Sequence, residues 1–375
     1  MTKSKAHLVL RNRVKATDSS HSILFYPLFF QPNLHSVIWG GGQLRKYKGL
    51  SDITEPIGES WEVSAIPSSV SIVSNGKWEG QDLNSLIDKY PDAILGKKVN
   101  EKYKGKLPLL VKLIDAKQDL SIQVHPNDEY AQRKHGKSGK SELWYVIKAE
   151  EGSRLYTGLK HKVSKEELYR HINNGSITEV LAEHKVKAGD VFYIPSGRIH
   201  SICGGIMLAE VQQSSDITYR LFDYNRKGLD GKPRELHIDM GLEAVDYKVE
   251  DNYRTLYSDC NNKAVQIVKT PYFSIRVMEL SKPFHRNLLK YDSFVISLCV
   301  EGDCLIHVRS TGEDYVLREG NSTLIPAIIA DYDVKPLHGK CRVLDTYIDN
   351  MRMSIFDNIT YFCQRLVKSI QLFEK

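Results

Sequence analysis

The sequence is poor in cysteine, has no long apolar run and carries no large excess of either charge. Its six cysteines form no CxxC pair and no dense cluster, so neither a disulfide framework nor a cysteine-held zinc is expected. We interpret them as small apolar side chains in a core. No apolar run approaches the roughly 20 residues that span a bilayer, so no contact with a membrane is expected.

The positive charge that the chain does carry lies mostly at its N-terminus. The formal net charge is +6, and residues 1–17 hold five lysines and arginines with no acidic residue. The remaining chain is close to neutral, which argues against a nucleic-acid-binding face. The same segment has only Leu8 to Leu10 as an apolar run, too short for a secretory signal. We therefore predict a basic, flexible N-terminus over residues 1–22 and a cytoplasmic protein.

Four side chains in two separate segments have the chemistry of metal ligands. Gln123 and His125 are two residues apart in an apolar run, so on a strand their side chains point to the same face. Glu142 opens a second strand-like run, and His200 follows a Pro/Gly turn. Two imidazoles, a carboxylate and an amide oxygen suit a divalent transition metal with an open position. A single histidine on a strand is more often packed or hydrogen-bonded, but the combination favours a metal site.

The spacing around these residues resembles the two motifs of cupins. Residues 189–200, GDVFYIPSGRIH, match the core of the second motif, although Gly204 stands where that motif usually ends in asparagine. The first motif has Gln123 where many cupins have a histidine. Two strands and a Pro/Gly hairpin would place the ligands rigidly on the inside of a small barrel.

A lysine precedes the predicted acidic ligand. Residues 135–142 resemble a glycine-rich phosphate loop only in composition, and a solvated turn is the simpler interpretation. Lys140 lies two residues before Glu142, on the same face if the strand has already begun there. It could then place a cation in the pocket, available to a phosphate or an oxyanion.

Short helices are predicted between the strands. Residues 82–90 have helical apolar spacing, and Asn127 can cap a helix that ends at Gly136, beside the metal. Ser164 and Glu167 form a capping box for another helix. The polar segment 214–224, SSDITYRLFDY, lies within strand-like sequence and is a further site candidate.

Together, these motifs resemble the class I (type I) mannose-6-phosphate isomerases in their shorter bacterial form. The resemblance runs from about residue 26 to about residue 349 and includes the motifs QVHPND, SELWYV, IPSGRIHSI, QQSSDITYRLFDYNR and RELH. It implies an enzyme with one zinc ion per chain that interconverts mannose 6-phosphate and fructose 6-phosphate. The family's zinc ligands correspond to Gln123, His125, Glu142 and His200. Its essential arginine corresponds to Arg220, and its pocket lysine and glutamate to Lys140 and Glu210.

The chemistry of this reaction agrees with these roles. Moving a proton between C2 and C1 requires a base that serves both carbons and a cation that stabilises the enediol oxygens. A metal with an open position and the permanent charge of Arg220 can supply that stabilisation, and Arg220 can also bind the phosphate. Glu210 and a metal-linked water both remain candidates for the base. Glu210 in a purely structural ion pair is the alternative.

The C-terminal part contains a faint repeat of the first barrel. Residues 320–326 match residues 189–195 in spacing, but Asp331 stands in the place of His200. We therefore predict a mainly β fold of two cupin or jelly-roll barrels with a few short helices. The predicted units are a catalytic, metal-binding domain with helical insertions, a second, metal-free domain and a C-terminal amphipathic helix, over residues 23–250, 251–350 and 351–375.

Two functions from other classes remain open. A cupin oxygenase would use similar ligands, because two histidines and a carboxylate also suit iron, but it would not explain Lys140 and Arg220. A sugar-binding cupin without turnover would be expected to lack a ligand or Arg220, and neither is missing. The expected partner is a small sugar phosphate, and the expected state is a monomer or a homodimer.

Overall fold

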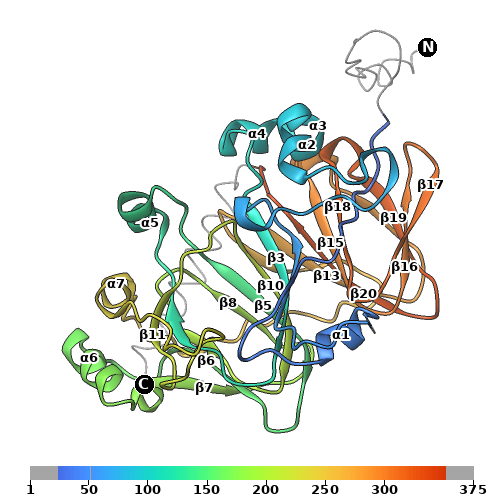
Figure 1. Ribbon diagram of the computed structural model, residues 1–375. Coiled ribbons are helices and arrows are strands. Elements are labelled where there is room, and N and C mark those ends of the chain that lie inside the picture. Colours follow the sequence, from blue (N-terminus) through green and yellow to red (C-terminus); the bar gives the residue numbers. More distant parts are fainter. Residues whose placement is uncertain (1–23, 51, 352–375) are drawn as a thin grey trace, which may run out of the picture.

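The computed structural model describes residues 24–50 and 52–351. Their strands form four antiparallel sheets, which pair as two sandwiches along the chain (Figure 1). The predicted mainly β fold is confirmed. The N-terminus over residues 1–22 and the apolar stripe predicted for the C-terminal helix lie outside the described residues. Among the described residues, no helix is both long enough and apolar enough to cross a bilayer.

The first sandwich contains the metal-ligand candidates. Its six-stranded sheet has the order β1 (Leu34–His35), β2 (Glu59–Val63), β3 (Leu109–Ala116), β10 (Ile206–Gln213), β5 (Glu142–Ala149) and β8 (Val191–Ile194). Its five-stranded sheet has the order β11 (Tyr219–Phe222), β4 (Ile122–Val124), β9 (His200–Ile202), β6 (Arg154–Leu159) and β7 (Leu181–Lys185). The two sheets face each other, because Trp144 and Phe192 from one share a buried cluster with Leu155 and Ile202 from the other.

Helices cover the outer face of the five-stranded sheet. Ile122 and Val124 point outward, into a cluster with Leu168 of α6 (Lys165–Asn173) and Leu242 of α7 (Ile238–Ala244). Since side chains alternate along a strand, Gln123 points into the barrel. The predicted capping box of α6, made by Ser164 and Glu167, is confirmed.

The other predicted helices are also present. Asn127 caps α5 (Asp128–His135), which ends at Gly136, and Asp82 caps α2 (Leu83–Lys89). The remaining α-helices are α1 (Gln43–Tyr47), α3 (Pro91–Leu95) and α4 (Lys97–Tyr103). Short 3-10 helices lie at Pro67–Ser69, Gly76–Trp78, Ile177–Val180, Leu289–Tyr291 and Ala327–Ile329.

The second sandwich has the same type of architecture. Its five-stranded sheet has the order β12 (Val265–Lys269), β13 (Ser274–Leu280), β20 (Cys341–Tyr347), β15 (Val295–Glu301) and β18 (Ser322–Ile325). Its four-stranded sheet has the order β14 (Phe284–Asn287), β19 (Asp331–Pro336), β16 (Cys304–Val308) and β17 (Glu313–Leu317). Asp331, at the position that corresponds to His200, contacts His285 at 2.7 Å. Within the described part of the chain, no potential metal cluster was found in this sandwich.

The two sandwiches share a continuous apolar core. Val111 and Leu113 on the outer face of β3 belong to the same buried cluster as Val277 and Leu344 of the second sandwich. The Lys48 ammonium group contacts both sandwiches. It lies 2.7 Å from a Glu62 carboxylate oxygen of the first sandwich and 2.7 Å from the Gly320 carbonyl oxygen of the second. The domain limits at residues 23, 250 and 350 stay predictions.

Candidate metal centre and active site

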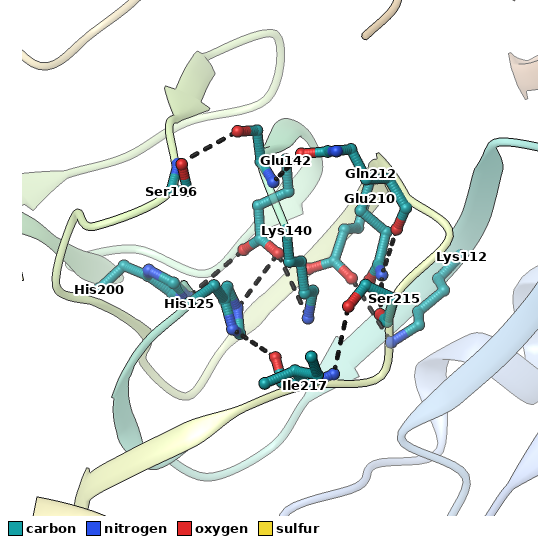
Figure 2. Close-up of polar contacts among 12 residues, drawn as sticks. Lys112, His125, Lys140, Glu142, Ser196, His200, Glu210, Gln212, Ser215 and Ile217 are labelled. Carbon is teal, nitrogen blue, oxygen red and sulfur yellow. Dashed lines mark hydrogen bonds and ion pairs between the residues drawn. The ribbon is translucent and has the colours of Figure 1, made fainter. Parts of the chain in front are cut away.

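Three of the predicted ligands meet inside the first sandwich. His125 directly follows β4, Glu142 opens β5 and His200 opens β9, so the barrel wall holds each of them. The Nε2 atoms of His125 and His200 each lie 3.4 Å from a different oxygen of the Glu142 carboxylate. All three side chains are at most 1% exposed. Figure 2 shows them pointing toward one another.

Local hydrogen bonds determine which nitrogen of each imidazole is free. His125 Nδ1 lies 2.9 Å from the Ile217 carbonyl oxygen, and His200 Nδ1 lies 2.8 Å from the Arg198 carbonyl oxygen. A carbonyl only accepts, so Nδ1 carries the proton and Nε2 presents a lone pair. Neither Nε2 atom nor either oxygen of Glu142 has a hydrogen-bond partner. Four buried acceptor atoms thus converge, an arrangement that a cation would satisfy.

Burial and charge keep these groups in the state that a metal requires. Burial, with the nearby Lys140 ammonium group, lowers the pKa of His125 to about 3. Burial also lowers the pKa of His200. For Glu142, burial opposes ionisation, but the charge of Lys140 and the interactions with His125 and His200 together lower the pKa of the carboxyl. The imidazoles are therefore neutral and the carboxylate ionised, so the 3.4 Å contacts are not salt bridges.

A backbone hydrogen bond links the turn before His200 to His125. Gly197 has a φ of +87°, a conformation that favours glycine. Its N–H group donates to the His125 carbonyl oxygen at 2.8 Å. The Pro/Gly turn thus fixes the backbones of the two histidines relative to each other.

Gln123 lies in a row of polar residues across the five-stranded sheet. It is the direct cross-strand partner of His200 on β9 and of Arg220 on β11. His200 in turn pairs with Thr157 on β6. Directly paired residues point to the same face of a sheet, so Gln123 and Arg220 lie on the same inner face as His200. The role of Gln123 as a ligand stays a prediction.

Lys140 lies beside Glu142, although not on a strand. β5 begins only at Glu142, so strand alternation does not explain the orientation of Lys140. The Lys140 backbone N–H group donates to the Pro126 carbonyl oxygen at 3.1 Å. Its buried ammonium nitrogen lies 3.4 Å from a Glu142 oxygen.

Glu210 faces the cluster from β10. One of its oxygens accepts a hydrogen bond from Trp144 Nε1 at 3.0 Å, and the other lies 3.5 Å from the Lys112 ammonium group. Lys112 also contacts Glu59 at 3.3 Å. Burial, and then the charge of Glu142, raise the pKa of Glu210. Lys112, Glu59 and Trp144 were not predicted from the sequence, because their partners come from other strands.

Arg220 lies at a more open edge of the same interior. Its Nη1 group donates to the Glu235 carbonyl oxygen at 2.7 Å, and its Nε atom is buried without a partner. Burial lowers the pKa of Arg220, and nearby Arg234 adds to this effect. Arg234 itself pairs with Asp223 at 2.7 Å between Nε and Oδ2.

Gln212 was not predicted from the sequence either. It is the cross-strand partner of Glu142 and lies two residues after Glu210. The detectable signal was this spacing, since polar residues at alternate positions of an apolar strand share one face.

A surface groove lies on the other side of β10. It has a volume of about 580 Å³ and is lined by Gln213, Asp216 and Tyr272, among others, but by none of the three metal-cluster residues. Because successive residues of a strand point to opposite faces, Gln212 faces the cluster and Gln213 faces the groove. The groove is therefore separate from the His125/Glu142/His200 cluster.

Comparisons with known proteins agree with this geometry. The model of the phosphomannose isomerase type I catalytic domain matches residues 28–157, and that of the mannose-6-phosphate isomerase cupin domain matches residues 263–348. Mannose-6-phosphate isomerase from Streptococcus mutans is 36% identical over 307 residues, covering 82% of this chain and 94% of that protein. ManA, a mannose-6-phosphate isomerase from Bacillus subtilis, is 34% identical, covering 82% and 96%.

Solved structures give the same result. The crystal structure of a mannose 6-phosphate isomerase from Bacillus subtilis superposes with a TM-score of 0.75 at 33% identity, covering 85% of this chain and 99% of that chain. A putative mannosephosphate isomerase from Archaeoglobus fulgidus shares the fold, with a TM-score of 0.71 at 24% identity, covering 87% and 99%. With these matches and the buried His/Glu/His cluster, the chain belongs to the type I mannose-6-phosphate isomerase family.

Proposed function

We propose that the protein is a zinc-dependent isomerase that interconverts mannose 6-phosphate and fructose 6-phosphate by proton transfer through an enediol. The observation that carries the metal requirement is the convergence of four buried acceptor atoms on His125, Glu142 and His200. No proton lies between these atoms, so a cation is the group that would satisfy them. Imidazole and carboxylate ligands suit zinc.

One zinc ion per chain would be held by His125, Glu142 and His200, with Gln123 as the fourth ligand. When bound, the ion supplies Lewis-acid stabilisation to a substrate oxygen. Because Glu142 would be the only charged ligand, the metal centre would keep a net positive charge. Such a centre favours the negative charge that develops on the enediol oxygens.

Arg220 and Lys140 would contribute further positive charge. Arg220 is a permanent cation with several N–H donors, suited to a phosphate or an enediolate oxygen. Lys140 is buried and beside Glu142, where its ammonium group stabilises the ionised carboxylate. An anionic, polyhydroxylated substrate is the class that two such cations favour.

Glu210 is our candidate for the group that moves the proton between C2 and C1. Its raised pKa makes the carboxylate a stronger base than an exposed glutamate. Its contacts with Trp144 and Lys112 hold it in one orientation. A metal-linked water remains the second candidate for the base.

A coupled assay tests the proposed function. Purified protein should convert mannose 6-phosphate into fructose 6-phosphate, lose activity in a chelator and regain it with added zinc. An oxygenase would show no conversion without oxygen and turnover once oxygen is admitted, which would reject the isomerase. A sugar-binding protein would show binding without conversion under both conditions.

Isotope incorporation tests the enediol. In deuterium oxide, some deuterium should enter C1 of fructose 6-phosphate, because a base that holds the proton can exchange it with solvent. Conversion without any label would instead indicate a shielded base or a hydride shift. The cytoplasmic location and the monomeric or homodimeric state stay part of this proposal.

A further inference from the structure

Gln212 is a buried amide beside the His125/Glu142/His200 cluster. It lies on β10, directly opposite Glu142 on β5, and it is fully buried. It shares the inner face of the barrel with Glu210, two residues earlier, and the two lie side by side in Figure 2. A neutral polar side chain at this depth requires hydrogen-bond partners.

Only one half of this amide has partners. The Gln212 Nε2 group lies 3.0 Å from the Gln213 carbonyl oxygen and 2.7 Å from the Ser215 carbonyl oxygen. Both partners only accept, so the nitrogen and the oxygen of the amide cannot be exchanged. The remaining atom, Oε1, is buried and has no partner.

The two bonds of the NH₂ group also fix the direction of Oε1. They use both amide hydrogens and tie the side chain to the segment that carries Ile217, whose carbonyl oxygen accepts from His125. A side chain needed only to hold this segment would require only the two donors. The free acceptor therefore needs a separate explanation, because a buried acceptor without a donor destabilises the fold.

We propose that Gln212 Oε1 accepts a hydrogen bond from an O–H group of the ligand in this pocket, and that this O–H group is a hydroxyl of the bound sugar. This role rests on the proposed function, because it assigns the substrate to the pocket beside Glu142. The bond orients the open-chain sugar relative to the metal centre. A water molecule on the metal is the other source of an O–H group.

A thermodynamic cycle on binding tests the proposal without turnover. The ligands are mannitol 6-phosphate, which has no carbonyl group to isomerise, and analogues that each lack one hydroxyl. The proteins are zinc-loaded wild type and Gln212→Met, in which Met has a similar size but no acceptor. Affinities are measured by titration calorimetry. For one analogue, loss of the hydroxyl should weaken binding to the wild type roughly 5- to 20-fold, but binding to the variant less than about 2-fold.

Two further variants separate this role from a structural one. Gln212→Asn keeps the amide but withdraws its oxygen by one methylene, and it should show the same loss of coupling if Gln212→Met does not fold. Gln213→Met is the matched control. The Gln213 amide oxygen already accepts from the Ser141 backbone N–H group at 2.9 Å, so this change should weaken all ligands by one common factor.

The remaining outcomes assign the O–H group or overturn the proposal. Equal weakening for every ligand, together with weaker zinc binding in a chelator competition, would assign the O–H group to a water on the metal. Equal weakening with unchanged zinc binding would make Gln212 a purely structural residue. If the wild type binds no mannitol 6-phosphate although it isomerises mannose 6-phosphate, the sugar-hydroxyl role is wrong and the proposed function stands. If the wild type neither binds mannitol 6-phosphate nor converts mannose 6-phosphate, both the sugar-hydroxyl role and the proposed function are wrong.

Discussion

His200 Nε2 lies 3.4 Å from Glu142 Oε1, and neither atom carries a proton. The imidazole proton is on Nδ1, bonded to the Arg198 carbonyl oxygen, and the carboxyl is ionised because its pKa is lowered. Two buried acceptors at this distance repel each other unless a cation lies between them or close by. Lys140 supplies one such charge at 3.4 Å from the other Glu142 oxygen, and the His125/Glu142/His200 arrangement fits a bound metal ion as well.

The first prediction concerns metal content. The protein should bind about one divalent metal ion per chain, and the double variant His125→Ala/His200→Ala should bind almost none, because it loses both imidazole ligands. Elemental analysis of the purified proteins measures this. His285→Ala, which removes the histidine paired with Asp331 in the second sandwich, is the control and should keep its metal. Metal retained by the double variant would reject the metal-free prediction for the second sandwich.

A second prediction concerns Arg220. Arg220→Ala should lower kcat by about 10²-fold or more, as expected for a cation that acts on charge that grows in the transition state. Steady-state kinetics with mannose 6-phosphate measures this. Arg309→Ala, which removes a surface arginine paired with Asp333, should leave kcat and KM unchanged. A rise in KM alone would show that Arg220 binds substrate and transition state equally.

Glu210 should be required for proton transfer. Glu210→Gln keeps the size of the side chain but removes its basicity, and kcat should fall by about 10²-fold or more. Glu59→Gln is the matched control, because Glu59 is the other carboxylate on Lys112 and should have a much smaller effect. Equal effects of the two changes on kcat would instead mean that Glu210 acts only as an ion-pair partner.

The metal-free protein should lose stability in mild acid. Below pH 6.5, the ordinary imidazole value, the unfolded chain takes up protons at His125, whereas the folded chain does so only near its lowered pKa of about 3. The contribution of His125 to the unfolding free energy should therefore be fully present above pH 6.5 and should decrease as the pH drops towards 3. The decrease from His125 is at most about 1.4 kcal/mol per pH unit.

Urea denaturation of the metal-free protein at several pH values measures this effect. His125→Gln should have a shallower decrease between pH 6.5 and 3 than the wild type. The exposed His338 offers a control, since His338→Gln should leave the slope unchanged. An unchanged slope in His125→Gln would show that other groups cause the acid sensitivity.

Local features of the chain were predictable because short stretches of sequence specify them. Alternation in the first motif placed Gln123 and His125 on one face, and the cap residues marked helices such as α5 and α6. The spacing of the second motif indicated the turn before His200. The resemblance to a family extended these local patterns to an activity and a set of site residues.

The tertiary structure decided which distant strands lie side by side. Only the pairing of β3, β10 and β5 brings Lys112 and Trp144 to Glu210. Lys140 reaches Glu142 from the loop before β5, where strand alternation does not apply. The direction of the Gln212 amide depends on two carbonyl groups of a folded loop. The sequence by itself determined the ligand types and their local strands, whereas burial and strand register, which arise from long-range packing, determined their protonation and their partners.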